Sequence, residues 1–260
     1  MKNAIAIFAV AGMAAAAGAD TVTTYDFDAN VVGGRNLSFN QTPPPGSFSS
    51  AGDGFEVYDR DASASIPFSL LDDTLSFPSD SIGIVKSTKL DAWFGMTDTV
   101  NGDLPDGIVN ATWEFDISGF QNLAISIDMG AMGDYEDRGS ADPDYFDWSV
   151  SIDGGAAVPL FTSFIDVDGS HTYVMEDGTT RDLDDPMYMN GQLIDNNFSA
   201  VVAAVAGTGN VLTLQFNGRT NGGSEAYAFD NIVITGDAVP APGSLTLMGL
   251  AGIAGLRRRR

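Results

Sequence analysis

The chain has 260 residues, 44% of them hydrophobic, which is enough to bury a sizeable core in one domain. Its net charge is -23, and without Lys2 and Arg257 to Arg260 the body holds seven basic and 35 acidic residues, or about -28. Such a surface repels phosphate backbones and argues against nucleic acid as a partner, whereas it suits divalent cations. The absence of cysteine excludes disulfides, thiolate catalysis and sulfur-ligated zinc.

Residues 1–19 have the order of parts of a secretory signal peptide. Lys2 supplies a positive start, residues 5–17 form a short apolar stretch, and small residues follow up to Ala19. We expect signal peptidase to cut between Ala19 and Asp20. The alternative is a buried N-terminal helix, but the Ala-rich run shows no amphipathic period.

Residues 20–237 have the pattern of an all-β domain. Apolar and polar residues alternate over 122–129, 210–216 and 226–236, as they do in half-buried strands, and Gly-bearing turns separate the runs. Residues 196–210 allow a turn or two of helix, although their valines equally permit a strand. We therefore expect one antiparallel β-sandwich of jelly-roll type, preceded by a signal helix and followed by a short hydrophobic helix.

Two short stretches resemble secreted jelly-roll modules. Residues 226–236, AYAFDNIVITG, are similar to their closing strand, where an Asp-Asn or Asp-Asp pair interrupts the apolar run, and residues 144–155 are similar to their Asp-rich turn. In the carbohydrate-binding members, a structural calcium lies between the first and last strands. The resemblance therefore implies a calcium site at Asp26, Asp28 and Asp230. If the first strand continues through Asp26 and Asp28, these two share one face.

The acids are densest over residues 134–147. Calcium takes roughly six to eight oxygen ligands, and a loop rich in carboxylates supplies several of them. Glu136 and Asp147 are further candidate ligands on this ground. The alternative is that these acids are solvated turn residues and caps. The segment comprises Asp134, Glu136, Asp137, Asp142, Asp144 and Asp147.

Catalytic patterns are incomplete. Residues 113–120, WEFDISGF, begin like the catalytic strand of laminarinase-type glycosidases, but Ser118 and Gly119 stand where the second glutamate is needed. His171 is the single histidine, it follows no G-x-S-x-G elbow, and we expect it in a surface loop. The sequence predicts no enzyme.

Aromatic rings are candidates for a sugar-stacking platform. Trp113 and Trp148 lie in alternating runs, which favours the core for both, whereas the pattern leaves Trp93 undecided. Tyr135 and Tyr145 on the acidic segment are further candidates.

The chain ends with Pro240-Ala241-Pro242, an apolar run over 244–256 and Arg257, Arg258, Arg259 and Arg260. Residues 239–260 thus resemble the PEP-CTERM sorting tail of Gram-negative bacteria, with Ala241 in place of the glutamate. The resemblance implies transient anchoring in the inner membrane, cleavage by an exosortase, and delivery to the cell envelope or extracellular matrix. A plain transmembrane anchor without processing is the alternative.

Export and the lack of catalytic groups predict a structural or adhesive role in extracellular polymer. The alternative is a carbohydrate-binding module that recognises an extracellular polysaccharide, and a more distant one is an unrecognised hydrolase.

Overall fold

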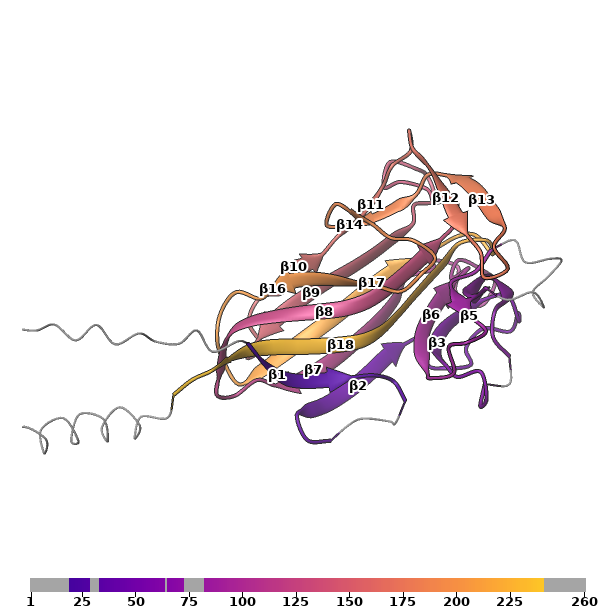
Figure 1. The fold of residues 1–260 in the computed structure, drawn as a ribbon. Coiled ribbons are helices and arrows are strands. Elements are labelled where there is room, and N and C mark those ends of the chain that lie inside the picture. The colour runs from indigo at the N-terminus through magenta and orange to yellow at the C-terminus, as the bar shows by residue number, and fades with distance from the viewer. Residues whose placement is uncertain (1–18, 29–32, 64, 73–81, 241–260) are drawn as a thin grey trace, which may run out of the picture.

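The computed structural model describes residues 19–28, 33–63, 65–72 and 82–240. Two antiparallel sheets lie face to face as a β-sandwich (Figure 1). The first has the order β16-β8-β18-β6-β3, and β1 also pairs with β18. Its strands are β1 (Asp20–Tyr25), β3 (Gly54–Tyr58), β6 (Trp93–Thr97), β8 (Phe120–Met132), β16 (Ser199–Ala204) and β18 (Ala226–Ala238).

The second sheet has the order β10-β9-β17-β7-β2. Its strands are β2 (Asn36–Thr42), β7 (Val109–Asp116), β9 (Tyr145–Ile152), β10 (Val158–Phe161) and β17 (Val211–Arg219). Consecutive strands cross between the two sheets, as from β7 to β8, β8 to β9 and β17 to β18. These crossings confirm the predicted antiparallel β-sandwich of jelly-roll type.

Small sheets decorate one end of the sandwich (Figure 1). They are β11 (Ser163–Ile165) with β14 (Met187–Met189) and β15 (Gln192–Leu193), the hairpin β12 (Ser170–Val174) with β13 (Thr180–Asp184), and β4 (Leu71–Asp72) with β5 (Val85–Lys86). A 3-10 turn, η1 (Phe68–Leu70), precedes β4. The part of the chain that the structure describes has no helix long and apolar enough to cross a membrane.

The core lies between the two main sheets and is largely aromatic. Strand β7 alternates buried and accessible residues, so its inward face brings Trp113 into a stack with Trp148 at 5.6 Å between ring centroids. Trp148 in turn meets Phe229 of β18 at 4.8 Å. The prediction that Trp113 and Trp148 are core residues is confirmed. Trp93 is also fully buried, in a second apolar cluster with Tyr58 and Leu70.

The predicted strands lie within β8, β17 and β18. Residues 196–210 contain strand β16 (Ser199–Ala204) and no helix, because Val201 and its neighbours pair with β8 and Val201 enters the core. The signal helix and the hydrophobic C-terminal helix that we expected fall outside the described residues. Asp20 begins β1 and pairs with Gly236 near the end of β18, so both ends of the described chain emerge at the same end of this sheet.

Candidate metal centre and ligand cavities

The predicted calcium ligands near the first strand do not share a face. Strand β1 ends at Tyr25, and Phe27 has a left-handed backbone with φ of 64°, so strand alternation stops before Asp26 and Asp28. Asp28 Oδ1 accepts a hydrogen bond from the Ala92 amide at 2.7 Å. Asp26 Oδ1 is buried and makes no hydrogen bond. The expectation of a common face is therefore wrong.

Asp230 pairs with a lysine. It is 1% exposed, and Lys89 Nζ lies 2.6 Å from its Oδ2. Burial raises the pKa of Asp230 to about 6, although the hydrogen bond and charge of Lys89 oppose this rise, so the carboxylate stays ionised at neutral pH. An internal ammonium thus occupies the position where we expected calcium to compensate Asp230.

Asp147 also has a protein partner. Its Oδ2 lies 2.6 Å from Arg138 Nη2, and its Oδ1 accepts the Ser163 amide hydrogen at 3.1 Å. The Arg138 guanidinium also lies over the Tyr145 ring, 5.0 Å from its centroid. Asp147 therefore helps to build a polar surface on β9.

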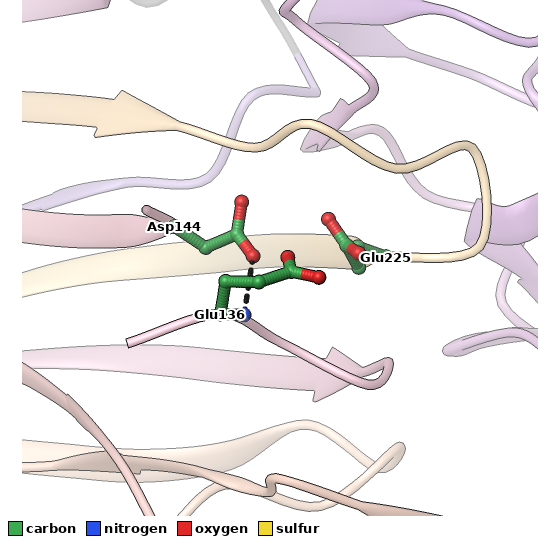
Figure 2. A group of neighbouring side chains, drawn as sticks. All are labelled: Glu136, Asp144 and Glu225. Carbon is green, nitrogen blue, oxygen red and sulfur yellow. Dashed lines mark hydrogen bonds between the residues drawn. The ribbon is translucent and has the colours of Figure 1, made fainter. Parts of the chain in front are cut away.

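Glu136, the remaining predicted ligand, belongs to a group of three carboxylates that point toward one another (Figure 2). Glu136 and Asp144 lie on the loop between β8 and β9, and Glu225 lies directly before β18. One carboxylate oxygen of each lies within 4.8 Å of the other two. We call Glu136, Asp144 and Glu225 the acidic triad.

Hydrogen bonds fix two of these carboxylates between the loops. Asp144 accepts the amide hydrogens of Glu136 at 2.8 Å and of Asn221 at 3.0 Å. Glu225 Oε2 accepts from the Thr220 hydroxyl at 2.7 Å and from the Gly222 amide at 2.8 Å. A Cβ at position 222 would clash with the Glu225 carboxylate, so a larger residue there would displace this side chain. The loops before β9 and before β18 are thereby held together.

The acidic triad lacks a basic partner. Asp144 is 1% and Glu225 is 5% exposed, and no lysine, arginine or histidine of the described residues forms an ion pair with any of the three. Burial raises the pKa of Asp144, and the charge of Glu225 adds to the rise. Burial likewise raises the pKa of Glu225, against the hydrogen bond from Thr220. Glu136 Oε2 is fully buried and makes no hydrogen bond.

The sequence contains only part of this arrangement. The acidic segment 134–147 includes Glu136 and Asp144, but their convergence requires the turn that the loop makes between β8 and β9. Glu225 stands alone in GGSEAY, and no local pattern marks it as a partner. Only the neighbouring positions of β8, β9, β17 and β18 in the fold bring it to the other two.

The exposed aromatic residues differ from the candidates. Trp93, Trp113, Trp148 and Tyr135 are all buried, so none of them offers a ring to a sugar. Tyr145 is partly exposed beneath Arg138. Among the described residues the most exposed ring is that of Phe164 on β11, at 62%, which sequence reasoning missed because a three-residue strand carries too little alternation.

Two surface cavities lie beside β9 and the loop that precedes it. The first, of about 210 Å³, is lined by Asp137, Arg138, Asp144, Ser163, Phe164 and Ile165. The second, of about 180 Å³, is lined by Asp147, Trp148, Ser149, Pro159, Thr162 and Asn217. The ion pair between Arg138 and Asp147 links their walls. Together they combine one exposed aromatic ring with charged, hydroxyl and amide groups.

The groups considered for catalysis are engaged elsewhere. Glu114 Oε2 accepts a hydrogen bond from the Ser38 hydroxyl at 2.9 Å. Asp116 Oδ2 forms an ion pair with Arg35 Nη1 at 3.4 Å. His171 lies on β12 and not in a loop, because residues 170–174 pair with 180–184 across a tight turn. Its ring meets the edge of Tyr173 at 4.6 Å.

No family model and no curated protein matches the chain. Solved structures that align with the chain include the CBM22-1-GH10 modules of Clostridium thermocellum endo-1,4-beta-D-xylanase 10B complexed with xylohexaose, at a TM-score of 0.35 and 9% identity over 85% of this chain and 29% of that one. The CBM22-1 xylan-binding domain from Paenibacillus barcinonensis Xyn10C aligns at a TM-score of 0.32 and 10% identity, over 87% of this chain and 100% of that one. The apo form of a cyclase from Fischerella sp. aligns at a TM-score of 0.42 and 10% identity, over 86% of this chain and 98% of that one. Carbohydrate-binding modules are thus among the solved structures that align with the chain.

Proposed function

We propose that this chain is an exported, non-catalytic module that binds a neutral extracellular polysaccharide at the two cavities along β9. The observation that carries the proposal is the exposed Phe164 ring beside a row of polar side chains. Phe164, whose side chain is 62% exposed, lines a cavity together with charged and hydroxyl side chains, and ligand pockets combine aromatic and polar groups in this way. An adhesive role in extracellular polymer follows from this binding.

The lining suits a sugar chain. A pyranose presents an apolar face of C–H groups and an edge of hydroxyls, so it needs a ring to stack on and planar polar groups to bond. Phe164 offers the ring, while Arg138, Asp147 and Asn217 offer donors and acceptors at the ends of fixed side chains. Two cavities whose walls are connected by the Arg138–Asp147 ion pair suit successive residues of a polymer better than one isolated sugar.

Charge favours a neutral polymer. The body carries about -28, so a polyanion such as alginate is repelled at low ionic strength. Arg138, the basic residue at the cavities, is already paired with Asp147. Uncharged glucans or xylans meet no such repulsion.

The absence of catalysis is part of the proposal. Hydrolysis of a glycosidic bond requires two carboxyls on opposite sides of the bond, roughly 5 to 9.5 Å apart. Asp147, which lines the second cavity, is held by Arg138 and Ser163 and is thereby suited to binding. Asp144, the buried acid at the first cavity, hydrogen-bonds backbone amides of both loops.

Export and sorting are inferred from the two ends. Ala19 and Asp20 are exposed at the very start of β1, so cleavage between them by signal peptidase would leave the strand intact. Pro240 is the last described residue and is exposed. Ala241, Pro242 and Arg257 to Arg260, which complete the tail, lie outside the described residues, and their role rests on the sequence.

Binding is tested by affinity electrophoresis and calorimetry with xylohexaose, soluble xylan, a soluble β-glucan and alginate. We expect at least one neutral polymer to bind, and Phe164→Ala to weaken it about tenfold or more. The control is Val202→Ala on β16, since Val202 is 63% exposed but lies on the other sheet. Binding of alginate alone, or equal binding by the Phe164→Ala variant, would overturn the proposal.

Sorting is tested by fractionation and by sequencing both ends of the mature protein. We expect an N-terminus at Asp20, loss of residues near Pro240, and recovery outside the inner membrane. Replacing the four terminal arginines with alanine should cause mislocalisation or secretion into the medium. An intact chain in the cytosol would contradict export.

A further inference from the structure

The acidic triad poses an electrostatic problem that the described protein atoms do not solve. Three carboxylates converge within 4.8 Å, and two of them are at least 95% shielded from solvent. Moving a carboxylate out of water is costly, and placing like charges nearby adds repulsion. Hydrogen bonds from amides and a hydroxyl satisfy part of Asp144 and Glu225 but bring no formal positive charge.

One oxygen points independently to a missing ligand. The Glu136 side chain is partly exposed, but its Oε2 is enclosed and makes no hydrogen bond to another described residue. Buried polar atoms without a partner are rare, because each one forfeits its interaction with water. In Figure 2 the Glu136 carboxylate lies between those of Asp144 and Glu225. A group that sits among the three would therefore satisfy this oxygen as well as the other two residues.

We propose that Glu136, Asp144 and Glu225 bind a divalent cation, with Ca²⁺ as the preferred ion. All three donors are hard carboxylate oxygens, which favour Ca²⁺ and Mg²⁺ over softer metals. Calcium tolerates an irregular ligand set, and backbone carbonyls and water complete its coordination. Asp144 also lines the first cavity along β9, which provides a path for the ion from solvent.

The position of the triad predicts what the ion does. Glu136 and Asp144 belong to the loop before β9, and Glu225 belongs to the loop before β18. A cation shared by the two loops would bind them together and would hold in place the segment that carries Arg138. The ion is therefore structural, and its binding does not depend on whether a polysaccharide is the ligand.

The test combines thermal unfolding with terbium luminescence on the purified protein. With EDTA removed and 1 mM Ca²⁺ added, we expect the Tm to rise by about 3 to 6 °C. Tb³⁺ should bind with luminescence sensitised by the buried Tyr135, and Ca²⁺ should displace it. Mg²⁺ should give a smaller shift, because it demands a more regular octahedral site.

Two variants locate the site. Glu225→Gln and Asp144→Asn should abolish the Tm shift and weaken Tb³⁺ binding about tenfold or more. In EDTA, Glu225→Gln should be at least as stable as the wild type, since it removes a buried charge, and this result shows that the variant folds. The matched control is Asp142→Asn, an exposed acid of the same loop that keeps an acceptor for Arg219, and it should retain the full shift.

A wild-type Tm that is the same in EDTA and Ca²⁺ would overturn the proposal. So would a shift that persists undiminished in Glu225→Gln and Asp144→Asn. Loss of polysaccharide binding with an intact calcium shift would count against the proposed function alone.

Discussion

Two acids of the last strand meet the same difficulty in different ways. Asp230 lies within β18 and Glu225 directly before it, and they are 1% and 5% exposed. Asp230 has an ammonium at 2.6 Å, whereas Glu225 faces Glu136 and Asp144. The contrast teaches that this fold treats buried carboxylates differently: Asp230 pairs with a cation of the chain, whereas Glu225 has no such cation among the described residues.

The positive charge that pairs with Asp230 comes from the Lys89 side chain. Lys89 is 17% exposed, and its ammonium also reaches Asp91 at 2.9 Å and lies 5.1 Å from the Phe198 ring centroid. Burial disfavours its charge, but hydrogen bonds to Asp230 and Asp91 outweigh this effect and raise the pKa of Lys89. The lysine therefore stays charged at neutral pH, and Asp230 needs no metal.

Breaking the Lys89 pair should have the largest effect. Lys89→Met keeps the aliphatic stem but leaves Asp230 buried without a counter-charge, so we expect a loss of about 3 to 5 kcal/mol in the free energy of unfolding at pH 8. Urea denaturation measures it. The double variant Lys89→Met, Asp230→Asn should recover most of the loss. If the single variant costs less than about 1 kcal/mol, Asp230 is compensated in some other way.

A second change would make the Asp230 region resemble the acidic triad. Asn231 has a left-handed φ of 51°, which aspartate also tolerates. Its side-chain amide nitrogen Nδ2 donates a hydrogen bond to Asp128 Oδ2 at 3.0 Å. Asn231→Asp replaces that donor with a carboxylate beside Asp128 and Asp230. We expect a loss of about 2 kcal/mol at pH 8 by urea denaturation.

The Asn231→Asp loss should shrink toward pH 5, because burial raises the pKa of Asp230 to about 6 and this neighbour then takes up a proton. The backbone control is Asn231→Gly, which accepts the same φ without adding charge. An equal loss in both variants would show that the missing amide hydrogen bond, and not charge, is responsible.

The fold could be predicted because its signal is local. Strands such as β8 and β17 alternate over enough residues to identify their inward faces, and the glycine-bearing turns separate them. The surroundings of a buried acid are not local. The sequence around Asp230 does not identify Lys89 as its partner, and the sequence around Glu225 does not identify Glu136 as its neighbour.

The same distinction explains the calcium prediction at the first and last strands. It assumed that β1 continues through Asp28, but Phe27 turns the backbone and enters the core. Glu136 was chosen because the acidic segment is dense, and this local signal led to a member of the triad. The prediction for the aromatic residues divides in the same way. Alternation identifies tryptophans such as Trp113 and Trp148 as core residues, whereas Phe164 lies on a strand too short to show a pattern.

A third carboxylate shows that a proton is another way to compensate buried charge, and it gives the smallest expected effect. Burial raises the pKa of Asp98 to about 6, and the neighbouring Asp53 adds to the rise through its charge and a hydrogen bond. The unfolded chain loses this proton near the ordinary value of 3.8. Between these two pH values the folded state holds a proton that the unfolded state has lost, so stability falls as pH rises through the window.

Asp98→Asn removes the charge and should escape that fall. Asparagine also accepts the left-handed φ of 42° at this position, so the backbone is not strained. Because solvent screens this half-exposed group, we expect a gain of only about 1 kcal/mol at pH 8, vanishing near pH 4. Asp103→Asn is the opposite case, since hydrogen bonds from Ser49 lower the pKa of Asp103 and its stabilisation is lost as pH falls. We therefore measure the free energy of unfolding of each variant minus that of the wild type at several pH values. This difference should rise with pH for Asp98→Asn and fall with pH for Asp103→Asn. Slopes of the same sign would show that the interaction between Asp98 and Asp53 is not the source of the pH dependence.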